Sequence, residues 1–297
     1  MATTQEFKGI HAVLYAFFDR DERLDRAAMR TQMQAVLDAG VDGIVVLGLA
    51  TEVAKLTATE RRTLMEWAAE DLDRRAPLGV TIFGGSVAEQ IEDVRAAESC
   101  GAKWLILQPP LVGSYGPAEY IRFFGRVADT ANVPVAIQNA PAYLGRGLSA
   151  SEIKDLTTQH PNVRLLKGEG PATDICAVIE ATGGRVPVFN GRGGLELTDN
   201  LRAGCAGFIL APDVIDLAVQ AFAHWSAGRH AEAEQLYARM LPATVFAMQS
   251  IEGLICYGKR LTASRIGLEV FDRAPAMRPT ELGLQIVSRF AEQLGPL

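Results

Sequence analysis

Eight short apolar segments, separated by amphipathic stretches, constrain the fold of this 297-residue chain more than any other feature. The segments are rich in Val, Ile and Leu and mostly do not alternate with polar residues. This pattern is typical of strands that are buried on both faces of a parallel sheet. The segments are residues 10–18, 43–47, 78–83, 104–107, 133–137, 163–166, 186–189 and 205–210.

Helical patterns fill the intervals, at residues 26–39, 59–74, 86–99, 117–130, 149–159, 172–181 and 195–203. Gly40 and Gly101 follow two of them as stop signals, and Thr57 with Glu60 fits a capping box at the start of another. Eight strands alternating with helices predict an α/β fold, the (β/α)8 TIM barrel. A doubly wound open sheet is the alternative, but the sequence has no G-x-G-x-x-G after the first strand and no Walker-type loop.

From Pro212 onward the apolar pattern is helical only. We therefore expect residues 1–211 to form the barrel that carries the active site. Residues 212–297 are expected to form a C-terminal helical region that is an appendage of the barrel rather than a separate catalytic domain.

Composition narrows the class of protein. A net charge of −6 argues against nucleic acid or an anionic membrane as the main partner. No apolar run approaches the roughly 20 residues that span a bilayer, and residues 1–9 lack the apolar core of a signal peptide, so a cytoplasmic protein is expected. The four cysteines are scattered singly and the four histidines lack ligand spacing, so we expect neither a disulfide framework nor a metal site.

The active site of such a barrel lies at the carboxyl ends of its strands, where Lys167 directly continues an apolar run. The chain has six lysines, and the other five occupy positions where a solvated lysine is expected. A desolvated lysine has a lowered pKa and can attack a carbonyl as an amine nucleophile. The alternative is a structural ion pair with Glu169 or Glu52.

Glu169 follows Lys167 by two residues, so both side chains would lie on one face of an extended strand. A carboxylate beside an iminium can move protons at the substrate. Alternatively, Glu169 only balances the charge of the lysine.

Two further loops are candidates for binding an anionic group. Residues 190–194, with Gly191 and Arg192, could form a nest of N–H groups with a guanidinium beside it, or be a plain glycine-rich turn. Thr51 and Glu52 could hold a substrate carboxylate, or Glu52 could cap the next helix.

Together these residues resemble the dihydrodipicolinate synthase / N-acetylneuraminate lyase superfamily of Schiff-base aldolases and dehydratases. The family's hallmarks are a G-x-x-G-E-like loop after strand two, a Tyr-Asn-x-Pro end to strand five and a lysine that ends strand six. Here they read Gly48-Leu49-Ala50-Thr51-Glu52, Gln138-Asn139-Ala140-Pro141 and Lys167. The resemblance covers essentially the whole chain and implies an imine on Lys167, no metal or organic cofactor, and a homotetramer.

The sequence also departs from the family pattern. Leu49 and Ala50 replace the threonine pair of the synthases, and Gln138 replaces the proton-relaying tyrosine. Tyr143 stands in place of an arginine, and residues 111–112 in place of the tyrosine that a partner subunit supplies. These changes argue against condensation of pyruvate with aspartate semialdehyde and against a typical sialic-acid aldolase.

The Gln-Asn-Ala-Pro end of strand five and the Lys-Gly-Glu run are most similar to the 2-keto-3-deoxy-L-arabonate dehydratase branch. That resemblance implies that Lys167 forms the imine and that Glu169, with bound water, takes over proton transfer. Gln138 and Asn139 would orient the substrate or the water. Arg192 departs from this branch, so an anionic distal end of the substrate is one possibility.

The loop at residues 48–52 would hold the C1 carboxylate of a 2-keto acid, through backbone N–H groups, including that of Ala50, and the Thr51 hydroxyl, beside Glu52. The favoured reaction is dehydration of a 2-keto-3-deoxy sugar acid. The first rival is a pyruvate-releasing aldolase, which needs Tyr143 or Glu169 as base. The second rival is a non-catalytic protein that binds 2-keto acids on the same fold.

Overall fold

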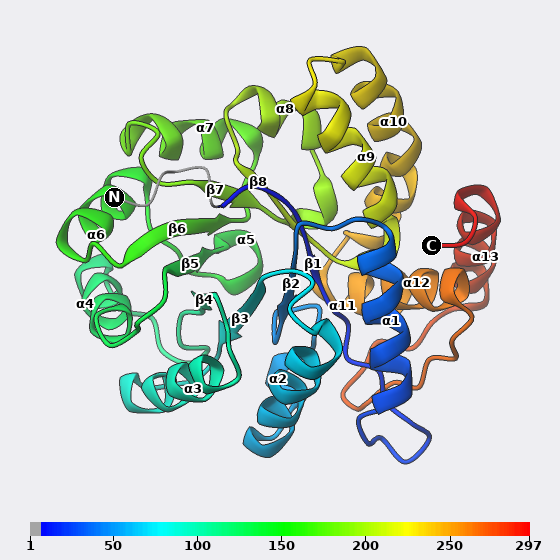
Figure 1. Ribbon diagram of the computed structural model, residues 1–297, viewed down its shortest axis with the longest axis horizontal. Coiled ribbons are helices and arrows are strands. Elements are labelled where there is room, and N and C mark those ends of the chain that lie inside the picture. The colour runs from blue at the N-terminus through cyan, green and yellow to red at the C-terminus, as the bar shows by residue number, and fades with distance from the viewer. Residues whose placement is uncertain (1–6) are drawn as a thin grey trace.

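The computed structural model describes residues 7–297 and shows a closed barrel of eight strands ringed by helices (Figure 1). Every strand pairs in parallel with its neighbours in sequence order, and β8 closes the barrel on β1. The predicted (β/α)8 fold is therefore confirmed. The strands are β1 Gly9–Val13, β2 Gly43–Val46, β3 Leu78–Ile82, β4 Trp104–Leu107, β5 Val135–Asn139, β6 Val163–Gly168, β7 Val188–Asn190 and β8 Gly207–Leu210.

The outer helices agree closely with the sequence pattern, and the Thr57–Glu60 capping box is present. A short extra helix, α5, follows β5 before the regular helix α6. The helices of this part are α1 Arg26–Asp38, α2 Ala58–Leu72, α3 Val87–Ser99, α4 Pro117–Ala128, α5 Pro141–Leu144, α6 Ala150–Gln159, α7 Ala172–Ala181 and α8 Leu197–Arg202, with 3-10 turns η2 Val53–Lys55 and η3 Arg192–Gly194.

The chain beyond β8 is helical, as expected. Helix α9 packs against β1 and α10, so it completes the outer ring beside the last strand (Figure 1). A π-helical turn, η5, leads directly into α12. The elements are η4 Pro212–Val214, α9 Ile215–Ser226, α10 His230–Ala247, α11 Ile251–Gly253, η5 Leu254–Gly258, α12 Lys259–Ile266 and α13 Glu281–Leu294.

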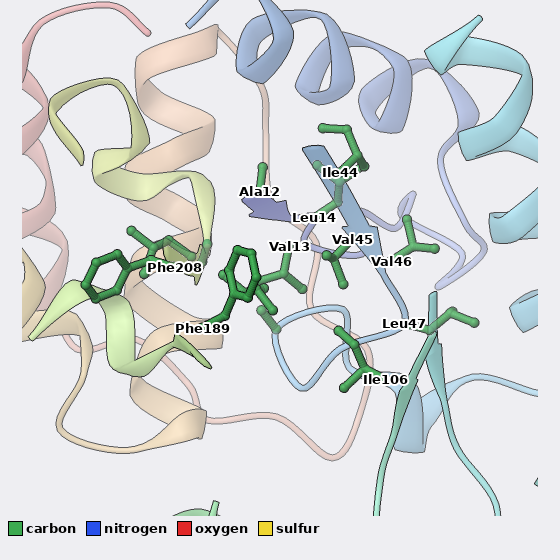
Figure 2. Close-up of a cluster of buried hydrophobic side chains, with 14 of the residues drawn as sticks. Ala12, Val13, Leu14, Ile44, Val45, Val46, Leu47, Ile106, Phe189 and Phe208 are labelled. Carbon is green, nitrogen blue, oxygen red and sulfur yellow. The ribbon is translucent and has the colours of Figure 1, made fainter. Parts of the chain in front are cut away.

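Side chains alternate between the barrel interior and the helix layer. Figure 2 shows Val13 and Val45 turned toward Phe189, whereas Ile44 points toward the outer helices. His11 of β1, Trp104 of β4 and Phe189 of β7 contact one another edge to face or stacked, although their strands are not neighbours. These three rings therefore lie inside the barrel.

Three expectations need correction. The first strand ends at Val13, and residues 14–18 continue as buried chain outside the barrel ladder, with isolated bridges from Phe18 to Leu24 and Phe271. Strand β6 extends to Gly168, so Lys167 lies within the strand. Lys259 is 0% exposed, so the prediction that every lysine except Lys167 is solvated is wrong.

No single helix in the part of the chain that the structure describes is long and apolar enough to cross a bilayer. His230–Ala247 and Ile251–Ile266 meet the length and hydropathy criteria only as a pair, and the pair is bent by 105°.

Candidate active site

Lys167 points into the barrel near the carboxyl ends of the strands. It is level with Phe189 on one side and with Gln138 on the other, and its side chain is 3% exposed. Among residues 7–297, Glu169 supplies the only carboxylate within 4 Å, with Oε1 at 3.6 Å from Lys167 Nζ. This separation balances the charge of the lysine without a direct hydrogen bond.

Glu169 lies on the same face as Lys167, as its spacing predicts, because its N–H bonds to Asn139 and continues the strand ladder. Gln138 Nε2 donates to Glu169 Oε2 at 2.5 Å. Gln108, directly after β4, donates from Nε2 to Gln138 Oε1 at 2.8 Å. The two glutamines and the glutamate thus form a buried chain of hydrogen bonds that ends beside the lysine.

Gly191 lies against this carboxylate. A Cβ added at Gly191 would be 2.5 Å from Glu169 Oε1, which no real contact allows. The absence of a side chain at residue 191 is therefore what lets Glu169 take its position.

The loop after β2 is anchored by buried charges. Both carboxylate oxygens of Glu52 are occupied, Oε2 by Lys55 Nζ at 2.6 Å and Oε1 by Lys259 Nζ. Glu52 itself has a φ of 57°, in the left-handed region. Glu52 therefore holds the loop through two lysines, and its part in substrate binding stays a prediction.

The Thr51 hydroxyl is also committed within the protein. It donates to the Leu14 carbonyl at 2.6 Å and accepts from the Gly48 N–H at 3.1 Å. By contrast, within residues 7–297 the N–H groups of Leu49 and Ala50 donate to no recorded acceptor. Backbone N–H groups, rather than the predicted hydroxyl, are thus what this loop offers to an anion.

Asn139 points away from the barrel interior. Its amide accepts from the Leu148 N–H at 2.7 Å and donates to the Leu148 carbonyl at 3.0 Å. This pairing fixes the segment that carries α5. Asn139 therefore shapes the loop, and its role in orienting the substrate stays a prediction.

Tyr143 and Arg192 lie near Glu169 on the other side of the mouth. Burial raises the pKa of Tyr143, a hydrogen bond with Arg192 opposes this rise, and the charge of Glu169 adds to it. Arg192 also pairs with Glu196 at 2.6 Å. The structure brings Tyr143 and Arg192 together near Glu169, and Arg192 already has an ion-pair partner in Glu196.

For two polar residues of the barrel interior, Gln108 and Thr81, no role is predicted from the sequence. Gln108 directly follows β4, and a polar residue directly after an apolar run is the signal that could have identified it. Thr81 is the one hydroxyl in β3, and it lies on the same face as Gly79, which contacts Trp104 inside the barrel. Within the described residues, Thr81 Oγ1 and Gln108 Oε1 are buried without a partner.

Comparisons with known proteins identify relatives of this chain. L-2-keto-3-deoxyarabonate dehydratase from Azospirillum brasilense is 28% identical over 250 residues, covering 81% of this chain and 80% of that protein. YagE from Escherichia coli K12, provisionally described as a 2-dehydro-3-deoxy-D-gluconate aldolase, is 31% identical over 157 residues. That match spans 53% of this chain and only about half of YagE, 52%.

Solved structures agree over nearly the full length. YagE in complex with pyruvate superposes with a TM-score of 0.88 at 25% identity, covering 97% of this chain and 98% of that chain. Dihydrodipicolinate synthase from Thermotoga maritima superposes at 0.90 with 17% identity, covering 98% and 100%, which supports the fold alone.

The family model named Dihydrodipicolinate synthetase family matches residues 6–291, nearly the entire chain. The matched residues include the barrel strands, the buried Lys167 of β6 and the loop after β2. The chain is a member of the dihydrodipicolinate synthetase family of lyases.

Proposed function

We propose that this lyase forms a Schiff base between Lys167 and a 2-keto acid and dehydrates a 2-keto-3-deoxy sugar acid. The observation that carries the proposal is the buried lysine 3.6 Å from a carboxylate that is itself bonded to a neutral amide. A lysine kept from solvent but not locked into a direct ion pair can present an amine to a carbonyl.

The first step joins the lysine to the substrate. Lys167 Nζ attacks the C2 carbonyl, water leaves, and a protonated imine forms. The imine acts as the electron sink for the following steps, so the mechanism itself calls for no other cofactor.

Glu169 then moves the proton. Its carboxylate takes a proton from C3, and the C–H electron pair moves into the iminium to give an enamine. The enamine expels the C4 hydroxyl, which leaves as water with the proton that Glu169 returns. A proton then leaves C5, which carries a hydroxyl, and another is added at C3, so the C3–C4 double bond moves to C4–C5 and the resulting enol becomes a carbonyl. Hydrolysis of the imine releases the product and restores Lys167.

The loop after β2 is suited to the C1 carboxylate. The N–H groups of Leu49 and Ala50 are free to donate, and Glu52 with its two lysines carries a net charge of +1 next to them. This positive field attracts an anionic group. The pyruvate bound by YagE is a 2-keto acid of the same chemical class.

Retro-aldol cleavage is the second candidate, and the position of Tyr143 favours it. The Tyr143 hydroxyl lies beside Arg192 and within the influence of the Glu169 charge, which supports Tyr143 as the base that retro-aldol cleavage needs at the C4 hydroxyl. Gln138 at the end of β5 favours dehydration instead, because an amide cannot relay a proton as a tyrosine does.

Product analysis separates the reactions. The protein is incubated with a panel of 2-keto-3-deoxy sugar acids, with the Glu169→Gln variant as a matched control. Water loss to a keto-acid semialdehyde supports the proposal, and pyruvate release would establish the aldolase. Binding of 2-keto acids that survives Lys167→Ala, with no turnover, would instead identify a binding protein.

A further inference from the structure

Gln108 is fixed at the carboxyl end of β4 by its backbone. Its N–H donates to the Ile82 carbonyl at 3.0 Å, and its carbonyl accepts from Gln90 Nε2 at 2.8 Å. Gln90 is completely buried and donates to the Gly84 carbonyl as well. The Gln108 side chain therefore starts from a rigid position, and its amide reaches Gln138 rather than the lysine.

The direction of the hydrogen bonds follows from the charge at their end. An ionised carboxylate only accepts, so Gln138 must present its NH2 group to Glu169 and its oxygen to a donor. Gln108 Nε2 is that donor, at 2.8 Å. Without it, the buried Gln138 oxygen would have no partner, and the amide would have less reason to keep its NH2 toward Glu169.

We infer that Gln108 is a positioning residue that, through Gln138, holds Glu169 as an ionised base beside Lys167. This inference rests on the proposed function and adds a residue from a third strand to it. Within residues 7–297 Gln108 forms no hydrogen bond with Lys167 or Glu169, and its hydrogen-bonded link to Glu169 runs through the Gln138 amide.

The unpartnered Gln108 oxygen gives the chain a second arrangement. Once Glu169 has accepted a proton, its O–H can donate to Gln138 Oε1 if the amides of Gln138 and Gln108 both turn over. Gln138 Nε2 then donates to Gln108 Oε1, which within the described residues has no partner in the first arrangement. Both charge states of Glu169 are thereby hydrogen-bonded, as a group that takes and returns a proton requires.

Other charged or polar groups also surround Glu169. Lys167 lies 3.6 Å away on the same strand, and Tyr143 and Arg192 face it from the loops after β5 and β7. None of these groups contacts Gln108 among the recorded hydrogen bonds of residues 7–297. A change at Gln108 therefore isolates the contribution of the amide chain.

The test follows exchange of the C3 hydrogens of pyruvate for deuterium in D2O, as a function of pH. Two variants are compared with the wild type. Gln108→Met removes the donor, and Gln108→Glu keeps the shape but places an acceptor there, which draws the Gln138 NH2 group away from Glu169. We expect both variants to slow exchange about 10-fold at low pH and to move the half-maximal rate up by about one pH unit.

Borohydride trapping of pyruvate is measured in the same samples, and saturation by pyruvate is expected to be unchanged. Gln32→Met is the matched control, because Gln32 is an equally buried glutamine that bonds only to the Tyr15 backbone and Met29. It should lower the melting temperature without moving the pH of half-maximal exchange.

Wild-type pH dependence in both Gln108 variants, or a shift equal to that of the control, would overturn the inference while leaving the imine chemistry intact. A wild type that forms no adduct with pyruvate would instead overturn the proposed function, and the role of Gln108 with it. If Gln108→Met does not fold, the isosteric Gln108→Glu decides the question.

Discussion

The barrel mouth holds two buried lysine–glutamate pairs that differ in how their charges are balanced. Lys259 is 0% exposed and bonds directly to Glu52, whose other oxygen binds Lys55. Lys167 is 3% exposed and lies 3.6 Å from Glu169, whose other oxygen accepts from the neutral Gln138. The first pair has its charges fully engaged, whereas the second leaves an amine free to react.

Burial alone therefore does not identify a reactive lysine. Burial lowers the pKa of Lys259, and the charge of Glu52 opposes that change. A direct ion pair of this kind anchors α12 to the loop after β2, 207 residues away in sequence. The bonding of the partner carboxylate therefore distinguishes a buried lysine with a structural role from one with a chemical role.

Replacing Lys167 or Lys259 with methionine should produce the largest effects, mainly a loss of reactivity at Lys167 and mainly a loss of stability at Lys259. Lys167→Met should abolish adduct formation and turnover, and it should cost less stability than Lys259→Met because Lys167 makes no direct hydrogen bond to Glu169 at 3.6 Å. Lys259→Met should cost about 3–5 kcal/mol of unfolding free energy, since it leaves Glu52 buried with one partner fewer. Denaturant unfolding and borohydride trapping of both variants check this, and a stable Lys259→Met protein that no longer forms the adduct would contradict the assignment.

Substitutions of Glu169 and Glu52 should differ in the same way, the first acting on turnover and the second on stability. Glu169→Gln should lower turnover about 10²- to 10⁴-fold, the usual contribution of a general acid–base group, while the adduct on Lys167 still forms. Glu52→Gln should instead lower stability, because two lysines lose their counter-charge. Steady-state kinetics and melting curves measure both, and equal loss of turnover in the two variants would refute the distinction.

Gly191→Ala tests how tightly the position of Glu169 is set. The added Cβ would displace the Glu169 carboxylate, and a displacement of about 1 Å can cost about 100-fold in rate. We expect a 10- to 100-fold lower turnover with unchanged trapping. Gly116→Ala, where a Cβ meets nothing within 4 Å, is the matched control, and an identical rate in both variants would contradict the prediction.

Asp213 extends the comparison to a buried carboxyl group with no directly bonded lysine. It is completely buried, accepts from the Tyr15 hydroxyl at 3.3 Å, and burial raises its pKa to about 6. The folded state then holds a proton that the unfolded state has lost, so stability falls as pH rises from about 4 to about 6. The penalty above that window is on the order of 3 kcal/mol.

Asp213→Asn should remove this penalty while keeping an acceptor for Tyr15. The unfolding free energy of Asp213→Asn should rise relative to that of the wild type as pH rises through the same window. The difference should be constant above that window. Denaturant titrations from pH 4 to pH 8 measure this, with the exposed Asp155→Asn as control. Parallel curves for the wild type and Asp213→Asn would show that the Asp213 carboxyl does not titrate this way.

Much of the fold could be predicted because its signals are local. Apolar runs, capping residues and glycine stops are read within a few residues of one another, and they indicate eight strand–helix units. Lys167 and Glu169 stand out for the same reason, since both extend one apolar run at a period of two.

The remaining site residues depend on contacts that no short window contains. The burial of Lys259 follows from packing of α12 over the loop after β2, and Gln108 gains its role only from the register between β4 and β5. Asn139 turns outward because Gln138 turns inward, so only one of two adjacent polar residues reaches the interior. Likewise, the Thr51 hydroxyl bonds to the distant Leu14 carbonyl and the Glu52 carboxylate bonds to the distant Lys259, contacts that no short stretch of sequence contains.

The most direct test is to determine which of the two buried lysines, Lys167 or Lys259, forms an adduct with a keto acid. The wild-type protein is incubated with pyruvate and borohydride, digested, and the modified peptide is identified by mass spectrometry. The account predicts one adduct, on the peptide that contains Lys167. Modification of Lys259, or no adduct on either lysine, would contradict it.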